Sequence, residues 1–489
     1  MTSFLNEIVD SNSGLFISGQ PGTGSGKEFP LINPANGQTL GILAEANADD
    51  VDKAVKSARQ AWTDSWWATD TERRIATLRK LAEVVEAKAD DIAYLDAIEA
   101  GKVVNESLSE DVPDVVANLR FFANLVEQAE GRFLQGADGW GWVEQIPVGV
   151  VGCVLPWNYP IAMLGWKVAP ALAAGNALVI KPSEESTLSA LYFARLAIEA
   201  GVPEGIVNVI SGQGAVTGQA LGLHNDVDAL TFTGSGPTGR RFLNYSAESN
   251  LKAVSLELGG RAGYLVDAEH ARDFDTIASD IVGAAFGTSG QNCTASSRII
   301  FVGGEPDDFG KFTDALVKAA QDFTVGDPFT DVNMGPVINQ RAADRIKNWV
   351  EEATKAGAEV LYQGPAVPEE GSWVSPTLIS EAPAGTTLST EEIFGPVSQV
   401  LQVSTREEAV ERINGERYGL ASTIWCEDVA QMKWWANQLR VGTVAVNGYS
   451  EGTVATPFGG LRESGFWGRD NGPEALATYQ ETKTVWVAP

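Results

Sequence analysis

Among the three cysteines of the chain, Cys293 has the surroundings that best suit a nucleophile. It lies in a polar, glycine-rich segment, residues 287–296, just before an apolar run that predicts a strand. Backbone amides and polar side chains in such a segment can favour the thiolate, the nucleophilic form of cysteine. Cys153 and Cys426 lie in apolar runs, so we expect both in the core. Cys293 is therefore a candidate for attack on a carbon electrophile, and a structural turn is the alternative.

A second candidate for chemistry is the segment Phe232-Thr-Gly-Ser-Gly-Pro-Thr-Gly239, which contains the pattern Gly-x-Gly-x-x-Gly after an apolar run. In dinucleotide-binding proteins this pattern places the N–H groups of a helix N-terminus against the pyrophosphate. The pattern alone is a weak signal, because glycine is common at strand-to-helix turns. Gly214, after the preceding apolar run, offers another close backbone approach. By this pattern Glu257, at the end of the next run, would hold the ribose.

Histidine and cysteine usage limits the metal chemistry that the chain can perform. The two histidines, His224 and His270, are interpreted as surface residues, and no cysteines have the spacing of a zinc site. The distant cysteines also indicate no disulfide framework. We therefore expect no metal and a reducing compartment.

Length and charge narrow the class of protein further. The 489 residues are enough for about three domains. The formal net charge of −29 would repel nucleic acid and anionic membranes, so we expect a small-molecule ligand. Residues 1–19 do not resemble a secretory signal, and no apolar segment reaches the ~20 residues that cross a bilayer. A cytoplasmic enzyme or binding protein is the expectation.

The element pattern predicts how these segments are positioned. Apolar residues recur at helical spacing over residues 49–62 and 71–100, so the N-terminal quarter should be mainly helical. Apolar runs then alternate with helical stretches, which is typical of parallel βαβ units in a doubly wound sheet. These runs cover residues 148–155, 177–182, 206–211, 228–233 and 253–258.

A second series of apolar runs follows Gly260 and predicts another α/β domain. It includes residues 264–268, 298–303, 398–403, 422–426 and 443–447, with helices expected over 341–356 and 428–439. Residues 140–143 and 482–488 alternate like edge strands and carry tryptophans. Exposed strands of this kind are hazards on a monomer, so we interpret them as an oligomerisation arm. The alternative is that they only pair with each other.

Five motifs together resemble the aldehyde dehydrogenase superfamily in order and spacing. They are Pro156-Trp-Asn-Tyr-Pro160, Leu256-Glu-Leu-Gly-Gly260, Gly290-Gln-Asn-Cys293, Glu391-Glu-Ile-Phe-Gly-Pro396 and Pro457-Phe-Gly-Gly460. The resemblance implies an α/β fold with three parts and a homodimer or homotetramer. The parts are a Rossmann-like cofactor domain (1–125 and 148–258), a catalytic domain (259–470) and a small β-strand oligomerisation arm (126–147 and 471–489).

The resemblance also implies the reaction, oxidation of an aldehyde to its acid with NAD. Cys293 would attack the aldehyde, and the Asn158 side chain and the Cys293 N–H would hold the alkoxide. Hydride loss would leave a thioester that Glu257 hydrolyses as general base, which replaces its assignment to the ribose. Lys167 would lie close and tune or relay protons, unless it is a solvated helix residue.

For the cofactor, the resemblance implies contacts along one crevice. Lys181 and Glu184 would hold the adenosine ribose, and the carboxylate would favour NAD over NADP. NADP stays an alternative if Lys181 and Ser183 accept its phosphate. The full set of implied cofactor residues is Trp157, Lys181, Ser183, Glu184, Gly214, Phe232, Gly234, Ser235, Glu392 and Phe394.

The aldehyde tunnel implied by the resemblance has aromatic walls and a polar lining beside the sulfur. Its residues are Tyr159, Met163, Trp166, Asn292, Thr294 and Phe458. Residues 447–452 resemble the ω-amino-aldehyde oxidising branch, such as γ-glutamyl-γ-aminobutyraldehyde dehydrogenase. Glu451 could meet a cationic substrate tail, but in so acidic a chain we expect an exposed glutamate.

The chain departs from the family pattern at three places. Arg261 stands where relatives usually have lysine, Leu461-Arg462 replaces tyrosine-lysine, and residues 464–469 carry one residue too many. These differences bear on specificity and assembly. Two other functions stay open, a dehydrogenase that passes the acyl group to CoA and a catalytically silent structural or binding relative.

Overall fold

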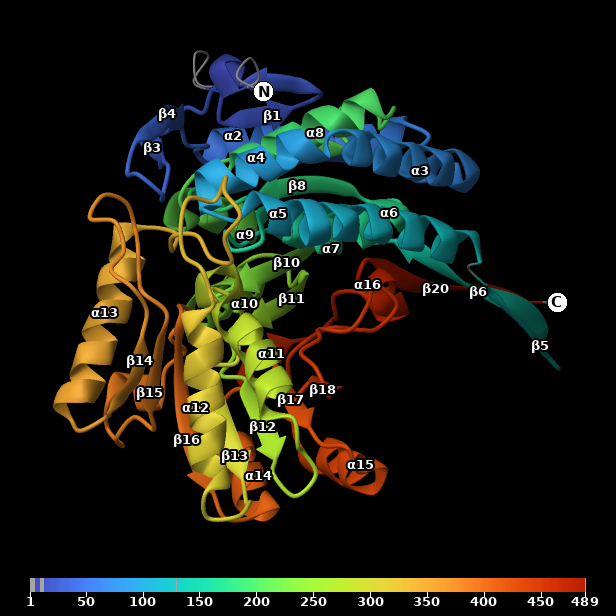
Figure 1. Cartoon of the computed structure of the whole chain (residues 1–489). Helices are drawn as coiled ribbons and strands as arrows, with labels where there is room; N and C mark the ends of the chain where they lie inside the picture. Colours follow the sequence, from blue (N-terminus) through green and yellow to red (C-terminus); the bar gives the residue numbers. More distant parts are fainter. Residues whose placement is uncertain (1–4, 9–12, 129, 489) are drawn as a thin grey trace.

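A computed structural model of the chain describes residues 5–8, 13–128 and 130–488. Residues 1–4, 9–12, 129 and 489, which belong to the predicted cofactor domain and arm, lie outside the described residues. Figure 1 shows one α/β unit at the top, a second below it, and a thin strand arm that extends to one side. None of the helices in the described ranges combines the length and apolar composition needed to cross a bilayer.

The first unit contains an eight-stranded sheet in the order β19-β11-β10-β7-β8-β9-β1-β2. Its five central strands are parallel and coincide with the five predicted runs. They are β7 (Val150–Val154), β8 (Ala177–Lys181), β9 (Val207–Ile210), β10 (Ala229–Gly234) and β11 (Ala253–Leu258). Because the chain proceeds from β7 to one side and then returns to its other side, the sheet is doubly wound as predicted. Antiparallel β1 (Leu15–Ile17), β2 (Gln20–Gly22) and β19 (Gly465–Phe466) flank it.

Helices cover this sheet, and local signals explain where several begin and end. The first, α2 (Ala48–Asp64), starts with a capping box between Asn47 and Asp50. The predicted continuous helix over 71–100 is instead two helices, α3 (Thr71–Ala87) and α4 (Ala89–Ala100), because Lys88 leaves helical geometry. The others are α5 (Val104–Glu106), the π-helical η1 (Ser107–Asp111), α6 (Val112–Glu127), α7 (Pro160–Ala173), α8 (Leu188–Glu199), the π-helical η2 (Gly214–Gly218), α9 (Gln219–Leu223) and α10 (Gly236–Glu248).

The predicted mainly helical N-terminal quarter also contains an antiparallel hairpin, β3 (Glu28–Ile32) with β4 (Thr39–Ala44). The hairpin alternates exposed and buried residues. Its strands are short, and a search for apolar residues at helical spacing does not detect strands. The prediction for this quarter is therefore right for its helices and incomplete for its strands.

The second unit has a seven-stranded sheet in the order β14-β15-β16-β13-β12-β17-β18. Five strands match the predicted second series: β12 (Gly263–Asp267), β13 (Arg298–Val302), β16 (Val397–Val403), β17 (Ala421–Trp425) and β18 (Thr443–Val446). The edge pair β14 (Val360–Gln363) and β15 (Thr377–Ser380) was not predicted. The helices are α11 (Phe274–Phe286), α12 (Asp308–Gln321), α13 (Gln340–Lys355), α14 (Arg406–Asn414) and α15 (Val429–Gln438). The last helix, α16 (Gly472–Thr478), packs instead against α7 in the core of the first unit.

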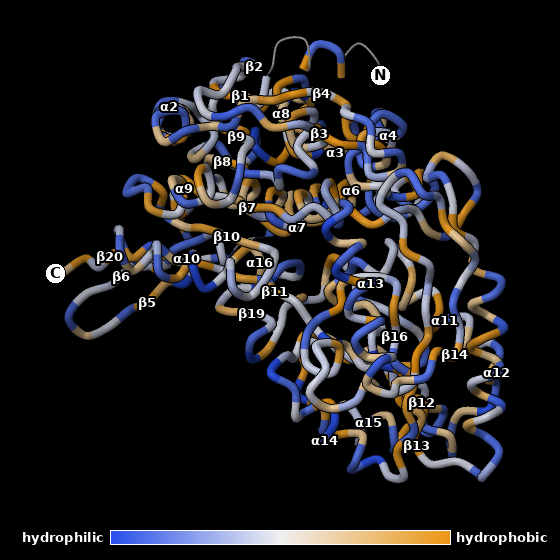
Figure 2. Tube along the Cα trace, turned by 90° about the vertical axis from the view of Figure 1, so that its left-hand side faces the viewer, coloured by the Kyte–Doolittle hydropathy of each residue, from blue (hydrophilic) through white to orange (hydrophobic). Residues whose placement is uncertain are grey.

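Apolar burial explains why these elements pack. Figure 2 shows outer helices such as α12 alternating between hydrophilic and hydrophobic residues, as expected of helices with one face on a core. The residues of β7, β8 and β13 are buried throughout, which fits strands covered on both faces. Cys153 and Cys426 are both 0% exposed, which confirms their assignment to the core.

The arm is a three-stranded antiparallel sheet in the order β20-β6-β5. Its strands are β5 (Arg132–Gly136), β6 (Gly139–Pro147) and β20 (Gln480–Val487). The two predicted edge segments pair with each other, because β6 and β20 are in register from Pro147 opposite Gln480 to Trp140 opposite Val487. Phe133, Trp140 and Trp486 nevertheless stay exposed by 65%, 44% and 49%. Pairing within the chain therefore leaves apolar surface on the arm.

Candidate active site

A ligand-sized pocket lies where the strand order of the first sheet reverses. The strands β7 and β10 are neighbours there, and their carboxyl ends lead into residues 156–159 and 234–235. In open α/β sheets this point is the usual place for a ligand crevice. The pocket has a volume of about 620 Å³ and is lined by both segments and by Cys293. Its size and position are those of a small-molecule site.

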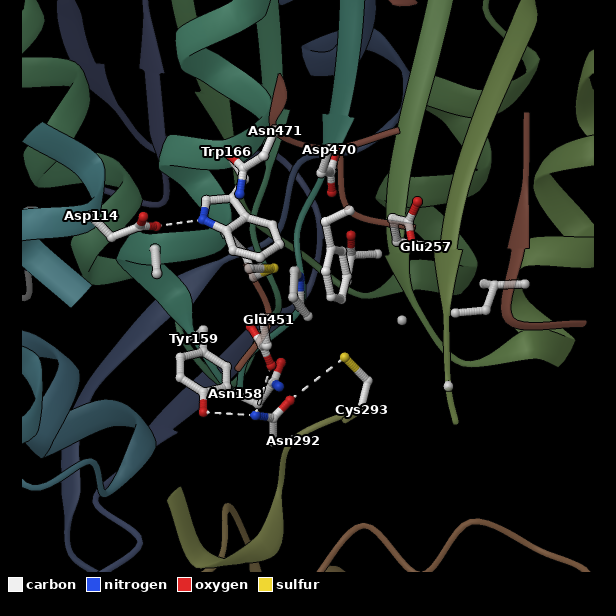
Figure 3. A pocket seen from close by; sticks show the side chains of 18 of the residues that line it. Asp114, Asn158, Tyr159, Trp166, Glu257, Asn292, Cys293, Glu451, Asp470 and Asn471 are labelled. Atoms are coloured by element: carbon white, nitrogen blue, oxygen red, sulfur yellow. Dashed lines mark hydrogen bonds between the residues drawn. The ribbon is translucent and has the colours of Figure 1, made fainter. Parts of the chain in front are cut away.

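The pocket brings together most of the predicted site residues, although they come from segments far apart in sequence (Figure 3). Thr294 lies beside it and hydrogen-bonds to Glu451, which lines the pocket. The predicted residues in the lining are Trp157, Asn158, Tyr159, Met163, Trp166, Gly234, Ser235, Glu257, Asn292, Cys293, Glu392, Phe394 and Phe458.

Of two further predicted residues, Phe232 does not line the pocket, whereas Lys167 is buried beside an acid of the lining. Phe232 is buried in the core against Phe242, with ring centroids 5.0 Å apart, so its side chain does not form part of the pocket wall. Lys167 is 0% exposed, and its Nζ lies 2.8 Å from Asp470 Oδ2. The alternative that Lys167 is a solvated residue is therefore wrong. Its partner Asp470 lines the pocket.

The remaining cofactor candidates lie along the same edge of the sheet. Lys181 ends β8, and its Nζ is 3.4 Å from Glu184 Oε2. Ser183, which lies between these two residues in sequence, is buried. Gly214 begins the π-helical segment after β9, where an added Cβ would meet no atom within 4 Å. The edge thus offers a charged pair and an open stretch of backbone.

The segment that presents Cys293 has an unusual backbone. Thr288, Ser289 and Gly290 follow α11 with φ values of 49°, 58° and 64°. A Cβ on Gly290 would lie 2.2 Å from the Gly395 carbonyl oxygen, so only glycine fits there. Ser289 Oγ donates to the carbonyl oxygens of Gly335 and Pro336. Left-handed residues held by such contacts are costly and cluster at functional sites.

The Cys293 thiol is partly exposed to the pocket but is not poised as a thiolate. Burial raises its pKa well above the ordinary value, and the charges of Glu451, Glu392 and Glu257 raise it further. Arg345 is the one basic side chain among the described residues of the lining. The expectation that this segment favours the thiolate is therefore wrong for the free protein, because burial and then the acidic residues of the pocket raise the pKa of the thiol.

Asn158 lies next to the cysteine and is held in one orientation. Its Nδ2 donates to the Gln291 carbonyl oxygen at 2.8 Å, and the side chain is buried. Gln291 is fixed in turn, because its Oε1 accepts from Ile338 N at 2.8 Å. A side-chain amide has two N–H donors, so an amide anchored through one can offer the other to a developing negative charge.

Glu257 is the last residue but one of β11, and its carboxylate is poorly satisfied. Its Oε2 accepts from Gly460 N at 3.3 Å, whereas its buried Oε1 has no hydrogen-bond partner among the described residues. Burial raises the pKa of Glu257 well above its ordinary value, and the nearby Asp470 carboxylate raises it further. A buried, unsatisfied carboxylate of this kind is a strong base once ionised.

Glu392 and Phe394 close the pocket on the side of the second unit. Glu392 Oε1 accepts from Gly260 N at 2.9 Å, and burial raises the pKa of this carboxyl to about 7. Phe394 meets Trp157 edge to face, with centroids 5.3 Å apart. Arg345 donates to the Ile393 carbonyl oxygen at 2.7 Å and so fixes this loop.

Sequence reasoning missed several acidic residues of the pocket. Glu451 is not an exposed glutamate as expected, because it lines the pocket and hydrogen-bonds to Asn292. Asp114 on α6 accepts a hydrogen bond from the Trp166 indole N–H, and Glu110 lies one turn before it. The resemblance of residues 447–452 to the ω-amino-aldehyde branch could have indicated Glu451. No motif near Asp114 in the sequence indicated a site.

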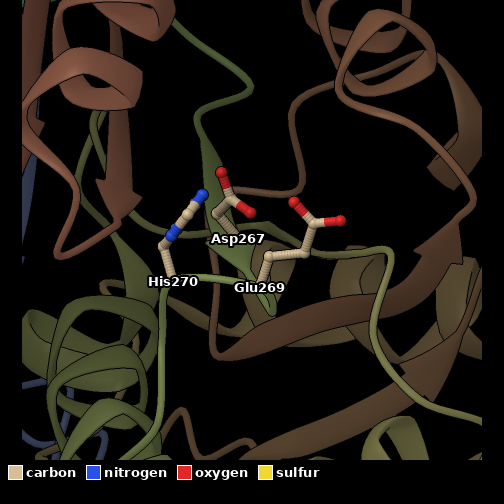
Figure 4. A group of neighbouring side chains, drawn as sticks. All are labelled: Asp267, Glu269 and His270. Carbon is tan, nitrogen blue, oxygen red and sulfur yellow. The ribbon is translucent and has the colours of Figure 1, made fainter.

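The histidines do not line the pocket, and both are partly exposed, as expected of residues at the surface. His224 Nε2 is 3.4 Å from Asp52 Oδ1. His270 lies with Asp267 and Glu269, three possible metal ligands within 4.8 Å of one another (Figure 4). Arg406 donates to both of these carboxylates, so their negative charge already has a cationic partner.

Comparisons with known proteins agree with this geometry. A doubly wound sheet with a pocket at its reversal point defines the dinucleotide-binding class of α/β proteins. The model of the Aldehyde dehydrogenase family matches residues 22–485, and the chain belongs to this family.

Similar proteins cover nearly the whole chain. Aminoacetaldehyde dehydrogenase of Pseudomonas aeruginosa is 38% identical over 94% of this chain and 92% of its own. The NADP/NAD-dependent aldehyde dehydrogenase PuuC of Escherichia coli is 34% identical over 97% and 95%. Among solved structures, an indole-3-acetaldehyde dehydrogenase with NAD+ has a TM-score of 0.93 at 34% identity, covering 98% and 97%. KauB of P. aeruginosa has a TM-score of 0.94 at 33% identity, covering 99% of both chains.

Proposed function

We propose that this protein is an NAD-dependent aldehyde dehydrogenase that oxidises an aldehyde to its carboxylic acid through a thioester on Cys293. The observation that carries the proposal is that Cys293, Asn158 and Glu257 line one pocket at the reversal point of the sheet. A nucleophile, an amide donor and an unsatisfied carboxylate are the groups needed for acyl-type chemistry on a carbonyl.

The proposed reaction starts when Cys293 loses its proton to water in the pocket and its sulfur bonds to the aldehyde carbon. The carbonyl electron pair moves to oxygen, where Asn158 Nδ2 and the Cys293 N–H donate to the alkoxide. As the carbonyl re-forms, the alkoxide would expel a hydride, and NAD, when bound, would supply the acceptor for it. Glu257 then takes a proton from water, whose oxygen attacks the thioester and releases the acid and the Cys293 thiolate.

The residues at the carboxyl edge of the first sheet suit NAD. Gly236 starts α10, and an added Cβ there would meet nothing within 4 Å, so the helix N-terminus is open to a pyrophosphate. Lys181 and Glu184 would hold the adenosine ribose, and Glu392 and Phe394 the nicotinamide end. The Glu184 carboxylate disfavours a 2′-phosphate, which makes NAD the main cofactor. NADP stays an alternative, as for the yeast enzyme named aldehyde dehydrogenase [NAD(P)+] 1.

For the substrate we infer an aldehyde with a cationic end, from the amino-aldehyde branch. Glu110, Asp114 and Glu451 give one wall of the pocket a negative charge. Trp166 and Phe458 stack edge to face, 5.0 Å apart, and supply an apolar wall for an alkyl chain. The name of the P. aeruginosa relative, aminoacetaldehyde dehydrogenase, supports this choice.

We infer the assembly of the protein from its exposed arm, and its location from its free thiols. The apolar arm would build a homodimer or homotetramer, since such surface is rare on monomers. The division into 1–125 with 148–258, 259–470, and 126–147 with 471–489 remains a prediction. Three unpaired cysteines fit a reducing cytoplasm.

A panel of aldehydes assayed with NAD and with NADP tests the proposed function. We expect NADH to form, measured by its near-ultraviolet absorbance, with acid as the product. Added CoA should leave the product unchanged, because Glu257 directs water to the thioester. No reduced cofactor with any aldehyde would favour the silent relative, and an acyl-CoA product would favour CoA transfer.

A further inference from the structure

The wall of the pocket beside Cys293 carries negative charge that the protein itself does not neutralise. Asp111 is paired with Lys102 at 2.9 Å, and Lys102 also contacts Glu106. By contrast, no ion pair among the described residues joins Glu110, Asp114 or Glu451 to a lysine or arginine. Arg345, the basic residue of the lining, donates to the Ile393 and Phe394 carbonyl oxygens instead.

Glu451 is separated from the cysteine sulfur by a single amide group. Its Oε1 accepts from Asn292 Nδ2 at 3.1 Å and from the Tyr449 hydroxyl at 2.9 Å. With Nδ2 turned toward Glu451, Asn292 directs its Oδ1 at the sulfur, and the Cys293 thiol donates to it at 3.6 Å (Figure 3). The same Oδ1 accepts from Thr294 N at 3.1 Å, which fixes the amide in this orientation.

This arrangement opposes ionisation of the sulfur in two ways. An acceptor oxygen at the thiol stabilises its protonated form, because a thiolate there would face a carbonyl dipole. Next to burial, the charge of Glu451 is the largest cause of the raised pKa of Cys293. The negative wall also affects its own members, since burial and the Glu451 charge together raise the pKa of Asp114 to about 6.

Resting on the proposed function, we propose that Glu451 holds Cys293 as a thiol in the free enzyme, and that the ammonium group of a cationic aldehyde neutralises Glu451 and so activates the nucleophile. Such a substrate switches on the residue that attacks it. A neutral aldehyde of the same length would enter the pocket without this effect. Selectivity for cationic aldehydes would then lie in the rate of attack as well as in binding.

The test is the alkylation of Cys293 by iodoacetamide in the full chain, without cofactor or aldehyde. The thiolate sulfur bonds to the reagent's methylene carbon, iodide leaves, and the thiol proton passes to water. Peptide mass spectrometry follows Cys293, because Cys153 and Cys426 are both 0% exposed. n-Propylammonium chloride mimics the cationic tail, and n-propanol with matched potassium chloride controls for occupancy and ionic strength.

We expect n-propylammonium to accelerate alkylation saturably by about tenfold, which is the change in thiolate fraction that one unit of pKa produces. n-Propanol should have no such effect. In Glu451→Gln the rate without amine should already be about tenfold higher, and the amine should no longer change it. Glu427→Gln, at an exposed acid outside the pocket, should behave as the parent does.

Unchanged or slower alkylation of the parent protein with n-propylammonium would overturn the proposal. An unaltered basal rate in a folded Glu451→Gln protein would do the same. If that variant does not fold, the parent measurement still decides. None of these readouts needs NADH formation, so failure of the proposed oxidation would be recognised separately, by the aldehyde panel.

Discussion

Two carboxylates face the same cysteine from opposite sides of the pocket and differ in almost every respect. Glu257 lies near the end of a buried strand, and its Oε1 has no partner among the described residues. Glu451 lies in the loop after β18, and its Oε1 accepts from Asn292, Thr294 and Tyr449. A carboxylate with an unsatisfied oxygen is suited to take a proton, whereas one with three donors is suited to hold its charge and to orient neighbours.

Hydrogen bonding alone can therefore give two carboxylates of one acidic pocket different roles. Glu257 would take the proton from water, and the buried Lys167–Asp470 ion pair lies near enough to influence its charge. The Glu451 side would set the charge that the substrate meets, together with Asp114. The following predictions separate these two sides, from the largest effect to the smallest.

The largest expected effect comes from replacing Cys293, the nucleophile that Glu257 and Glu451 both influence. Cys293→Ala should abolish NADH formation, a loss of at least about 10⁴-fold, since nothing else in the pocket can form the thioester. NAD binding should persist, because the cofactor contacts that we propose lie along β7, β8 and β10 and do not need the sulfur. Quenching of tryptophan fluorescence by NAD checks the second point, and steady oxidation by the variant would refute the role of Cys293.

Asn158→Ala removes the side-chain amide that we propose as a donor to the alkoxide. We expect kcat to fall by about 10²–10³-fold, the usual loss for one oxyanion donor, with a smaller change in KM. Steady-state kinetics with one good aldehyde measure both constants. An equal loss in binding and no loss in kcat would show that Asn158 only shapes the pocket.

Glu451→Gln should affect the preference for cationic over neutral aldehydes and leave the Glu257 side intact. We expect the ratio of kcat/KM between an ω-amino-aldehyde and the alkanal of equal length to fall by at least about tenfold, because Cys293 in the variant is activated for both substrates. The amino-aldehyde also loses a charge contact worth up to about 1 kcal/mol. Paired kinetics in the parent and the variant measure the ratio. Equal losses for both substrates would mean a structural role instead.

The smallest expected effect is a pH dependence of that preference. The pKa of Asp114 is raised to about 6, chiefly by burial, so this carboxyl is charged above that pH and neutral below it. Preference for amino-aldehydes should therefore rise by about two- to threefold as the pH increases through about 6. Asp114→Asn should remove this step, and a step that survives the substitution would belong to another group.

The sequence predicted the fold best where burial leaves a continuous pattern. The five central strands of the first sheet are apolar runs covered on both faces, and all five were found. Short elements such as β3, and the edge pair of β14 and β15, lack such a run. The break at Lys88 was missed because apolar spacing continues across it from α3 to α4.

For the site, motif residues such as Cys293 and Glu257 were predicted, but their electrostatic setting was not. The expected thiolate at Cys293 was wrong, because burial raises the pKa of the thiol, and the charges of Glu451 and Glu392, from distant segments, raise it further. Asp114 could not be found, since its position follows from packing of α6 beside α7. Phe232 was predicted as a cofactor residue because it begins a recognised motif, but its side chain belongs to the core.

The most direct measurement of the central claim is the mass of the Glu257→Gln protein after mixing with NAD and an aldehyde. The account predicts a burst of one NADH per active site and a protein heavier by one acyl group, located on the Cys293 peptide. Oxidation should then stall, because no base activates water at the thioester. Continued turnover, or NADH formation without an acyl group on Cys293, would contradict the account.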